Sequence, residues 1–347
     1  MKACILSIDG GGIRGIIPGV ILSYIEQQLQ IKTNNPNARL AEFFDLIAGT
    51  STGGILTCCY LLPNNANSPI SKYSAQETLN LYVNRGHKIF DVSFWQNLRS
   101  VYGLIHEKHS AVELEKALYD YFGNTTIKDF IKPCIITAYD IFKRRTIFFN
   151  KQDALNNNVR NFYIKDVARA TSAAPTYFEP ACIRSLNDEP LYLVDGGMFA
   201  NNPAMCAYVE AMKTDFKITS AKPEKPSNAT VKDMLIVSIG TGTAKKSYSY
   251  KEAKDWGKVG WLRPIIDILM SGNAETVDYE LCKIYSTLQS PDDMDYHRLE
   301  PSFAEAKHEM DDASLENIKA LLDAGKSFVS QKQYELDEIV SKLMDNN

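Results

Sequence analysis

The stretch Gly49-Thr50-Ser51-Thr52-Gly53 separates an apolar run over residues 43–48 from a second one over residues 54–60. This order predicts a strand, a tight turn and a helix, and the turn reads G-x-S-x-G, which is typical of the nucleophile elbow of serine hydrolases. Serine needs a nearby base and an exposed position to act as a nucleophile, and small glycines allow the sharp turn that provides this position. An ordinary strand-to-helix turn is the alternative. A phosphate-binding P-loop is disfavoured, since no lysine follows the second glycine.

A glycine cluster near the N-terminus predicts an anion-binding loop. The apolar strand over residues 3–8 is followed by Asp9-Gly10-Gly11-Gly12-Ile13-Arg14-Gly15 and then by a helical run from Ile16 to Leu29. Bare backbone N–H groups at a helix N-terminus bind phosphates or a developing oxyanion, and Arg14 adds positive charge. The same spacing fits a dinucleotide loop, but that loop expects an acidic residue about 20 positions further on, at the end of the next strand. Glu26, the nearest carboxylate, falls inside the predicted helix.

A third cluster places a carboxylate at a strand end. Residues 191–194 are apolar, Asp195-Gly196-Gly197 follows, and a helix is predicted from Ala204 to Lys213. An aspartate in this position can serve as a general base for a serine hydroxyl. The alternative is an Asx turn, in which the carboxylate binds local N–H groups.

In this order the three clusters resemble the patatin-like phospholipases, which carry D-G-G-G-x-[RK]-G, G-x-S-x-G and D-G-[GA]. Residues 170–178, ATSAAPTYF, resemble a fourth segment of that family, and the resemblance covers roughly residues 1–300. It implies that Ser51 is the nucleophile, that Asp195 is its only catalytic partner, and that Gly10, Gly11, Gly12 and Arg14 form the oxyanion hole. It also makes Gly49, Gly53, Gly196 and Gly197 motif glycines. No metal and no cofactor are implied.

The histidines allow a separate test of a Ser-Asp dyad against a Ser-His-Asp triad. The chain has five histidines, and only His297 follows Asp195 near a predicted late strand. A triad would use a histidine in such a place. In a dyad the carboxylate takes the serine proton itself, which requires a dry pocket that raises its pKa.

Composition agrees with an enzyme that has a large core. The chain has 347 residues, of which 45% are hydrophobic, and a formal net charge of −4, so a global basic field for nucleic acid is excluded. No apolar run is long enough to cross a membrane, and the N-terminus leads directly into a core strand, so we expect no signal peptide and a cytoplasmic protein. The seven cysteines are scattered, which favours reduced thiols.

Alternating elements predict a three-layer α/β/α fold with a mostly parallel central sheet and helices on both faces. All three motifs follow strand ends, so we expect them to meet beyond the carboxyl edge of the sheet. Strands over 133–139 and 144–149 form a predicted hairpin, the one antiparallel pair. We expect an acyl hydrolase domain over residues 1–312 and a C-terminal helix over 313–347 that packs on the domain or on a second copy. The predicted strands are 3–8, 44–48, 133–139, 144–149, 191–194, 234–239 and 295–299.

The function expected from these features is serine hydrolysis of acyl lipids, of phospholipase A or lysophospholipase type. The substrate partner would be a membrane phospholipid or another acyl lipid, with no nucleic-acid polymer, and peripheral membrane contact and homo-oligomers fit this function. The alternatives are a signal-regulated bacterial effector phospholipase, which the resemblance implies, and a non-catalytic lipid-binding module. Aromatic and basic residues over 244–270 suit a membrane surface, and a packed helix with a solvated lysine face explains them equally well. Residues 90–109 suit a lid.

Overall fold

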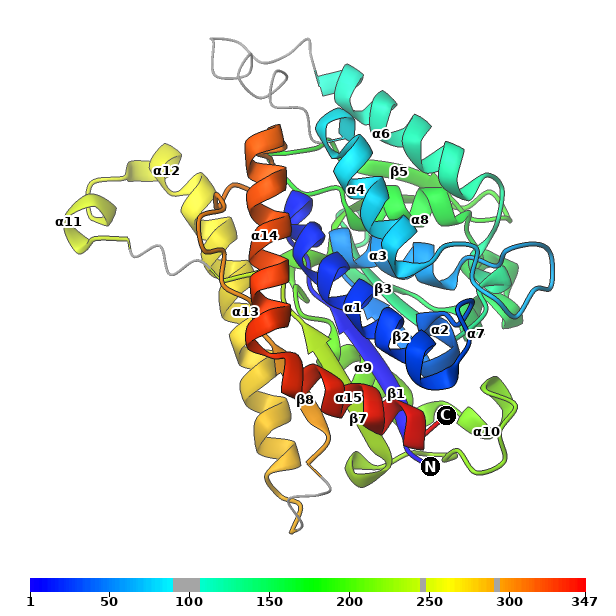
Figure 1. The fold of residues 1–347 in the computed structure, drawn as a ribbon. Coiled ribbons are helices and arrows are strands. Elements are labelled where there is room, and N and C mark those ends of the chain that lie inside the picture. Colours follow the sequence, from blue (N-terminus) through cyan, green and yellow to red (C-terminus); the bar gives the residue numbers. More distant parts are fainter. Residues whose placement is uncertain (90–106, 244–247, 290–293) are drawn as a thin grey trace.

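The computed structural model describes residues 1–89, 107–243, 248–289 and 294–347. These residues form an eight-stranded sheet in the order β5-β6-β3-β2-β1-β7-β8, with β4 paired to β3 (Figure 1). The strands are β1 (Ala3–Ile8), β2 (Leu46–Gly49), β3 (Cys134–Asp140), β4 (Arg145–Phe149), β5 (Ala181–Arg184), β6 (Pro190–Asp195), β7 (Met234–Ile239) and β8 (Tyr296–Leu299).

Most of the sheet is parallel, as predicted. The pairs β1–β2, β1–β7, β2–β3 and β7–β8 are parallel, and the predicted β3–β4 hairpin is antiparallel. Two further antiparallel pairs, β3–β6 and β5–β6, did not follow from the sequence. Strand β5 was missed because it is only four residues long and buries Ala181 and Ile183 but not Cys182 and Arg184. The predicted hairpin was therefore not the only antiparallel pair.

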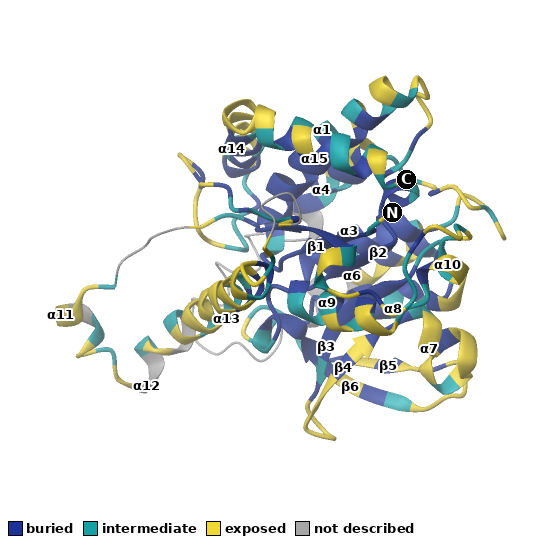
Figure 2. Ribbon diagram, turned by 90° about the horizontal axis from the view of Figure 1, so that it is seen from below, coloured by how far each residue is buried: buried dark blue, intermediate teal, exposed yellow. Residues whose placement is uncertain are grey.

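Helices cover both faces of the sheet, which gives the three-layer α/β/α fold. Alternate residues of β1 point to opposite faces: Cys4, Leu6 and Ile8 join one core, whereas Ala3 and Ile5 join the other. Figure 2 shows this dark, buried centre and the more exposed outer helices. The helices are α1 (Ile16–Thr33), α2 (Leu40–Phe43), α3 (Thr52–Leu61), α4 (Ala75–Ile89), α6 (Glu107–Phe122), α7 (Lys151–Asn156), α8 (Ile164–Thr171), α9 (Ala204–Lys213), α10 (Phe216–Thr219), α11 (Tyr250–Ala253), α12 (Gly257–Gly260), α13 (Leu262–Tyr285), α14 (Leu315–Gln331) and α15 (Gln333–Asp345).

The C-terminal segment forms two helices rather than one, with Lys332 between α14 and α15. Both helices contact α1, and their buried residues Leu321, Phe328, Ile339 and Leu343 belong to the larger core (Figure 1). We propose that residues 313–347 fold as one unit with residues 1–312. Among the described residues, no helix has both the length and the apolar character needed to cross a membrane.

Strands β2 and β6 meet end to end along one edge of β3. Ile47 of β2 donates its N–H to Pro133, and Ile141, just after β3, donates to Tyr192 of β6. In a strand, the backbone N–H and C=O groups of every second residue point to the same edge. Residues 133 and 141 are an even number of positions apart, so their hydrogen bonds place β2 and β6 at the same edge of β3. The register pairs Gly49 with Ile136 and Asp195 with Ala138, so the two strands stop on either side of Thr137.

This arrangement corrects one expectation. Strand β6 runs opposite to β1 and β2, so Asp195 does not reach the site from the carboxyl edge that those strands share. It arrives from the other direction, because β3 extends four residues past its last pairing with β2 and offers the extension to β6.

Candidate active site

Ser51 lies at the turn between β2 and α3, where it is the residue before the first helical one. Its backbone has φ 55° and ψ −121°, a conformation that is unfavourable for a residue with a Cβ atom. Its N–H donates to the Thr171 hydroxyl at 2.9 Å, which holds the turn. The flanking glycine is required by space, because a methyl group on Gly53 would collide with the carbonyl oxygen of Ile8. The sequence therefore builds the strained turn that the G-x-S-x-G spacing predicts.

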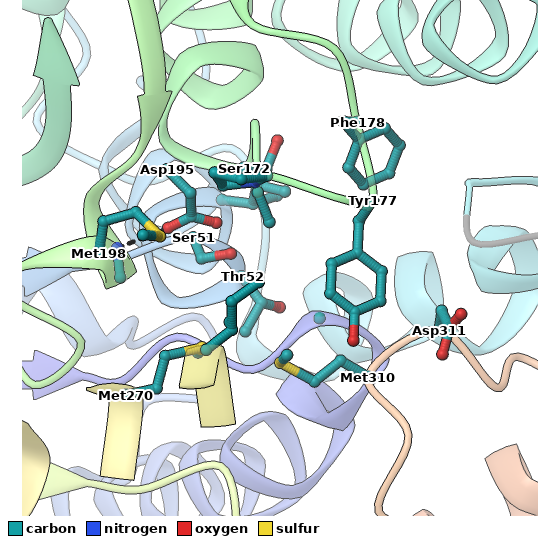
Figure 3. Close-up of a pocket in the computed structure, with 16 residues that line it drawn as sticks. Ser51, Thr52, Ser172, Tyr177, Phe178, Asp195, Met198, Met270, Met310 and Asp311 are labelled. Atoms are coloured by element: carbon teal, nitrogen blue, oxygen red, sulfur yellow. Dashed lines mark hydrogen bonds between the residues drawn. The ribbon is translucent and has the colours of Figure 1, made fainter. Parts of the chain in front are cut away.

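Asp195 ends β6 and points toward Ser51 (Figure 3). Its Oδ1 accepts the N–H of Gly197 at 2.7 Å, which fixes the carboxylate. Burial raises the pKa of Asp195 to about 7, although the hydrogen bonds with Gly197 and with the Ser51 hydroxyl oppose this rise. Only 4% of Asp195 and 7% of Ser51 are exposed. A carboxyl group with this pKa can exchange a proton near neutral pH, which a solvated aspartate does poorly.

The glycine loop lies beside Ser51 and supplies unused N–H groups. Gly10 donates its N–H to the Asn201 carbonyl at 3.1 Å, so it has no free donor for a substrate. A methyl group on Gly10 would lie 3.2 Å from Ser51 Cβ and 2.5 Å from Asn201 Oδ1, so this glycine makes room. Within the part of the chain that the structure describes, the N–H groups of Gly11 and Gly12 donate to no protein acceptor. Of the three predicted oxyanion glycines, Gly11 and Gly12 thus carry the available donors.

Arg14 orients this loop from behind. Its Nε donates to the Gly11 carbonyl oxygen at 3.0 Å, and its guanidinium lies 5.3 Å from the centre of the Phe303 ring. In a trans peptide the C=O and the next N–H point in opposite directions, so this bond turns the N–H of Gly12 away from Arg14. Gly12 has φ 60°, which favours glycine, and it lines the same pocket as Ser51.

The pocket above Ser51 and Asp195 is largely apolar. It encloses about 630 Å³, including the part that opens to solvent. Figure 3 shows Met270, Met310 and Tyr177 around the space in front of Ser51. A site with a few polar groups in apolar walls suits a ligand with one reactive polar group and an alkyl part. The other lining residues are Thr52, Ile55, Ser172, Ala174, Pro175, Phe178, Gly197, Met198, Ile266 and Asp311.

Comparison with known proteins identifies the family of the chain. The family model of patatin-like phospholipases matches residues 6–208, which contain all three motifs. The chain belongs to the patatin-like phospholipase family. Patatin-like protein 1 of Oryza sativa subsp. indica is 32% identical over 346 residues, covering 95% of this chain and 82% of the relative. Patatin-17 of Solanum cardiophyllum is 34% identical over 336 residues, covering 94% and 83% of the two chains.

Two further matches were found, one among relatives and one among solved structures. One relative at 33% identity, covering 97% of this chain and 90% of its own, is named probable inactive patatin-3-Kuras 1 of Solanum tuberosum. Family membership alone therefore does not establish activity, and the site residues must be considered individually. Among solved structures, VipD from Legionella pneumophila aligns with a TM-score of 0.44 at 13% identity, covering 97% of this chain and 67% of VipD.

Several residues that support this patatin-like site could not be found from the three motifs. Arg298 of β8 binds the carboxylate of Asp9, and Thr241 donates its hydroxyl to the Gly10 carbonyl at 2.7 Å. Both lie outside residues 6–208. The only sequence signal for Arg298 is indirect: Asp9 follows a strand that is apolar except for Ser7, so a buried carboxylate there needs a cationic partner.

His297, the triad candidate, is not brought to Ser51. It lies on β8 opposite Val237, and the charges nearest to it are Lys342 and Asp295, with Glu338 and Glu335 further along α15. Burial, and then Lys342, lower the pKa of His297. Of the other sequence expectations, the lid segment 90–109 lies outside the described residues up to the start of α6.

Proposed function

We propose that this protein is a serine hydrolase of acyl lipids, of phospholipase A or lysophospholipase type, that works through a Ser51–Asp195 dyad. One observation carries the proposal: a strained Ser51 and a buried Asp195 with pKa about 7 face each other in one apolar pocket. Gly12 lines the same pocket, and in the described residues its N–H and that of the preceding Gly11 have no protein acceptor. A non-catalytic lipid-binding module has no use for the strain or for the carboxylate.

In this scheme the Asp195 carboxylate takes the Ser51 proton while the Ser51 Oγ attacks the ester carbonyl carbon. The N–H groups of Gly11 and Gly12 hold the oxyanion, and Arg14 keeps their peptide in place. The bond to the leaving alcohol then breaks, and the protonated Asp195 returns its proton to that alcohol. Asp195 next deprotonates a water molecule, whose oxygen attacks the carbonyl carbon of the acyl–Ser51 ester. The bond from that carbon to Ser51 Oγ then breaks, Asp195 returns the proton to Oγ, and the fatty acid leaves. Every proton in the cycle passes through one carboxyl group.

The experiment that tests this function compares wild type with Ser51→Ala and Asp195→Asn on a panel of phospholipids, lysophospholipids and p-nitrophenyl esters. Released fatty acid is measured, and a fluorophosphonate probe reports covalent modification. Wild type should release fatty acid and be labelled at Ser51. Ser51→Ala should lose both properties, and Asp195→Asn should lose about 10²-fold or more in rate because an amide cannot take the proton. Unchanged turnover in a folded Ser51→Ala protein would exclude the covalent mechanism.

His297→Ala is the matched control for the dyad. Its charged neighbours are Asp295, just before β8, and three residues of α15, none of which lies at Ser51, so most activity should remain. Loss of activity in His297→Ala together with retention in Asp195→Asn would favour a triad.

We also propose that the first half of α13 rests on the membrane that supplies the substrate. Ile265, Ile268 and Leu269 are 45–48% exposed, while Ile266 and Met270 of the same helix line the catalytic pocket. One helix thus joins an exposed apolar face to the site of hydrolysis, and in Figure 2 this end of α13 projects from the body.

The surroundings of this face favour a lipid surface as its occupant. Trp256 packs edge-on against both Tyr248 and Trp261, with ring centres 5.1 and 5.0 Å away. Residues 245–267 contain six basic and three acidic residues, although the chain as a whole is acidic. Amphipathic aromatic rings and basic side chains around an apolar helix face are the features of an interfacial anchor.

A further inference from the structure

A line of side chains runs away from the nucleophile along one face of α3. Ser51, Ile55 and Cys59 are spaced by four residues, and Ile55 donates its N–H to the Ser51 carbonyl oxygen at 3.0 Å. Residues four apart lie above one another on a helix, so the side chains of Ile55 and Cys59 form a row that begins one turn beyond Ser51. Cys59 lies eight positions after Ser51, which corresponds to a rise of about 12 Å along the helix.

This row leads into a second pocket, between α3, α4 and α6. The second pocket encloses about 410 Å³, including its open part, and Ile55 lines both this pocket and the catalytic one. The residue that the two pockets share lies one helical turn beyond Ser51. The remaining lining residues are Cys59, Leu81, Tyr82, Leu114, Ala117, Leu118, Tyr121 and Phe122.

The polar atoms of the nearest walls are already in use. Tyr82 and Thr52 hydrogen-bond through their hydroxyls at 2.7 Å, and the Tyr82 hydroxyl also lies 3.1 Å from the Thr52 carbonyl oxygen. Burial raises the pKa of the Cys59 thiol to about 12, so this cysteine stays neutral and acts as a small apolar group. A ligand here meets apolar surface and finds little to hydrogen-bond, which fits an alkyl chain and excludes a charged head group.

We propose that the α3–α4–α6 pocket is an acyl-chain subsite, which takes the distal part of the fatty-acyl chain whose carbonyl is held at Ser51. Ile55 is the point at which the chain passes from the catalytic pocket into this subsite. The inference rests on the proposed hydrolase function and adds to it a preference for esters of medium and long chains, since a short acyl group ends before Ile55.

The test uses one variant that fills the subsite and one that enlarges it. Ala117 is buried on α6, so Ala117→Phe fills the pocket, whereas Leu118→Ala enlarges it. We measure kcat/KM for p-nitrophenyl butyrate, decanoate and palmitate below their aggregation limits. Ala117→Phe should lower the decanoate-to-butyrate ratio by about 10-fold or more, the discrimination that one or two methylenes produce in an apolar pocket. Leu118→Ala should raise the palmitate-to-butyrate ratio. Lys116→Phe, at an exposed neighbouring position of α6, is the matched control and should leave both ratios as in wild type.

Binding without turnover separates this inference from the hydrolase proposal. Decanoate is titrated calorimetrically into Ser51→Ala, with and without Ala117→Phe, and the fold of each variant is checked by circular dichroism. Weaker binding in the double variant supports the subsite even if no ester is hydrolysed. If esters are hydrolysed but both pocket variants keep wild-type ratios, the subsite is wrong and the hydrolase proposal stands. Should Ala117→Phe not fold, the direction of change in Leu118→Ala decides the question.

Discussion

Arg298 donates hydrogen bonds to both oxygens of the Asp9 carboxylate, with Nη1 3.0 Å from Oδ1 and Nη2 2.6 Å from Oδ2. Asp9 opens the glycine loop, and Arg298 lies on the edge strand β8, so a residue far along the chain fixes the start of the loop that faces Ser51. Arg298 also donates to the Ser238 hydroxyl at 2.8 Å and pairs with Glu300. The Asp9 side chain is 3% exposed and that of Arg298 is 11% exposed, so the pair is largely desolvated.

Replacing Arg298 alone should lower the free energy of unfolding by more than replacing both Arg298 and Asp9. Arg298→Met leaves the Asp9 charge buried without a partner, and we expect a loss of about 3–5 kcal/mol in the free energy of unfolding. Adding Asp9→Asn removes that charge, so the double variant should recover part of the loss. Urea unfolding of wild type, Arg298→Met, Asp9→Asn and the double variant completes a double-mutant cycle for the free energy of unfolding. A single Arg298→Met variant within about 1 kcal/mol of wild type would mean that the pair is hydrated and of small consequence.

Removing the Cβ atom of Ser51 should relieve strain. Ser51→Gly and Ser51→Ala both lack the hydroxyl, but only glycine accepts φ 55° with ψ −121° readily. Backbone strain of this kind costs about 1–3 kcal/mol, and the greater freedom of glycine in the unfolded chain offsets about 0.4–1 kcal/mol of that gain. Ser51→Gly should therefore unfold at a higher temperature than Ser51→Ala. Equal melting temperatures would show that the turn is not strained in solution.

Activity should follow the ionisation of Asp195. Only the carboxylate form can take the serine proton, so kcat/KM for a soluble ester should rise about tenfold per pH unit below pH 7 and level off above it. Burial also raises the pKa of Glu300 to about 7, and its side chain is 31% exposed. Glu300→Gln is therefore the control, and it should leave the midpoint in place. If Glu300→Gln moves the midpoint of the pH profile, the titrating group is Glu300 and not Asp195.

Stability should show the opposite trend with pH. The folded pKa of Asp195 lies above its unfolded value of about 4, so its contribution to stability is complete below about pH 4 and is lost as the pH rises through about 7. Asp195→Asn cannot ionise, so its stability relative to wild type should increase over that interval. Guanidinium unfolding at pH 5 and pH 8 measures this; the same difference at both pH values would mean that the carboxyl group titrates normally.

The glycine loop should affect catalysis rather than binding. A methyl group on Gly11 would collide with the Thr241 side chain, whose Cβ would be 2.6 Å away, so Gly11→Ala must shift the loop. The loss of one oxyanion donor typically costs about 3 kcal/mol of transition-state stabilisation. The effect should appear in kcat with little change in KM, since the charge develops only during the reaction. Arg14→Ala should be milder. Wild-type kcat in a folded Gly11→Ala protein would show that another element holds the oxyanion.

The exposed face of α13 can be tested apart from catalysis. Replacing Ile265, Ile268 and Leu269 with asparagine should weaken binding to anionic phosphatidylglycerol vesicles while butyrate ester hydrolysis continues. Tyr279, 64% exposed near the other end of α13, gives the matched control Tyr279→Asn, which should bind vesicles as wild type does. Co-sedimentation measures the bound fraction. Equal binding by the triple variant and wild type would place membrane contact elsewhere.

The sequence predicted those parts of the fold that depend on local patterns. The sequence located seven of the eight strands, most of them from apolar runs, and the motifs located Ser51, Asp195 and the glycine loop. The direction of β6 could not be predicted, because an apolar strand reads the same whether its neighbour is parallel or antiparallel. The role of Gly10 was also hidden, since the partner of its N–H, Asn201, is nearly 200 residues away in the chain. Arg298 was overlooked beside His297 for the same reason: only the three-dimensional pairing of β7 and β8 brings it to Asp9.

Because β2 and β6 meet end to end along β3, this one strand fixes the spacing of Ser51 and Asp195. Ser51 and Asp195, the proposed nucleophile and base, lie at the ends of strands that pair with the same edge of β3, and one residue, Thr137, separates the two anchoring pairs. The Thr137 hydroxyl lies 2.7 Å from that of Thr50, beside the nucleophile, and a methyl group on Gly196, beside the base, would meet the Thr137 side chain. Because both strands are anchored on β3, we expect motions of the outer helices to move Ser51 and Asp195 together. A residue inserted into or deleted from β3 between Ile136 and Ala138 would change their separation, so under the proposed mechanism the length of this strand would set the distance over which the proton is transferred.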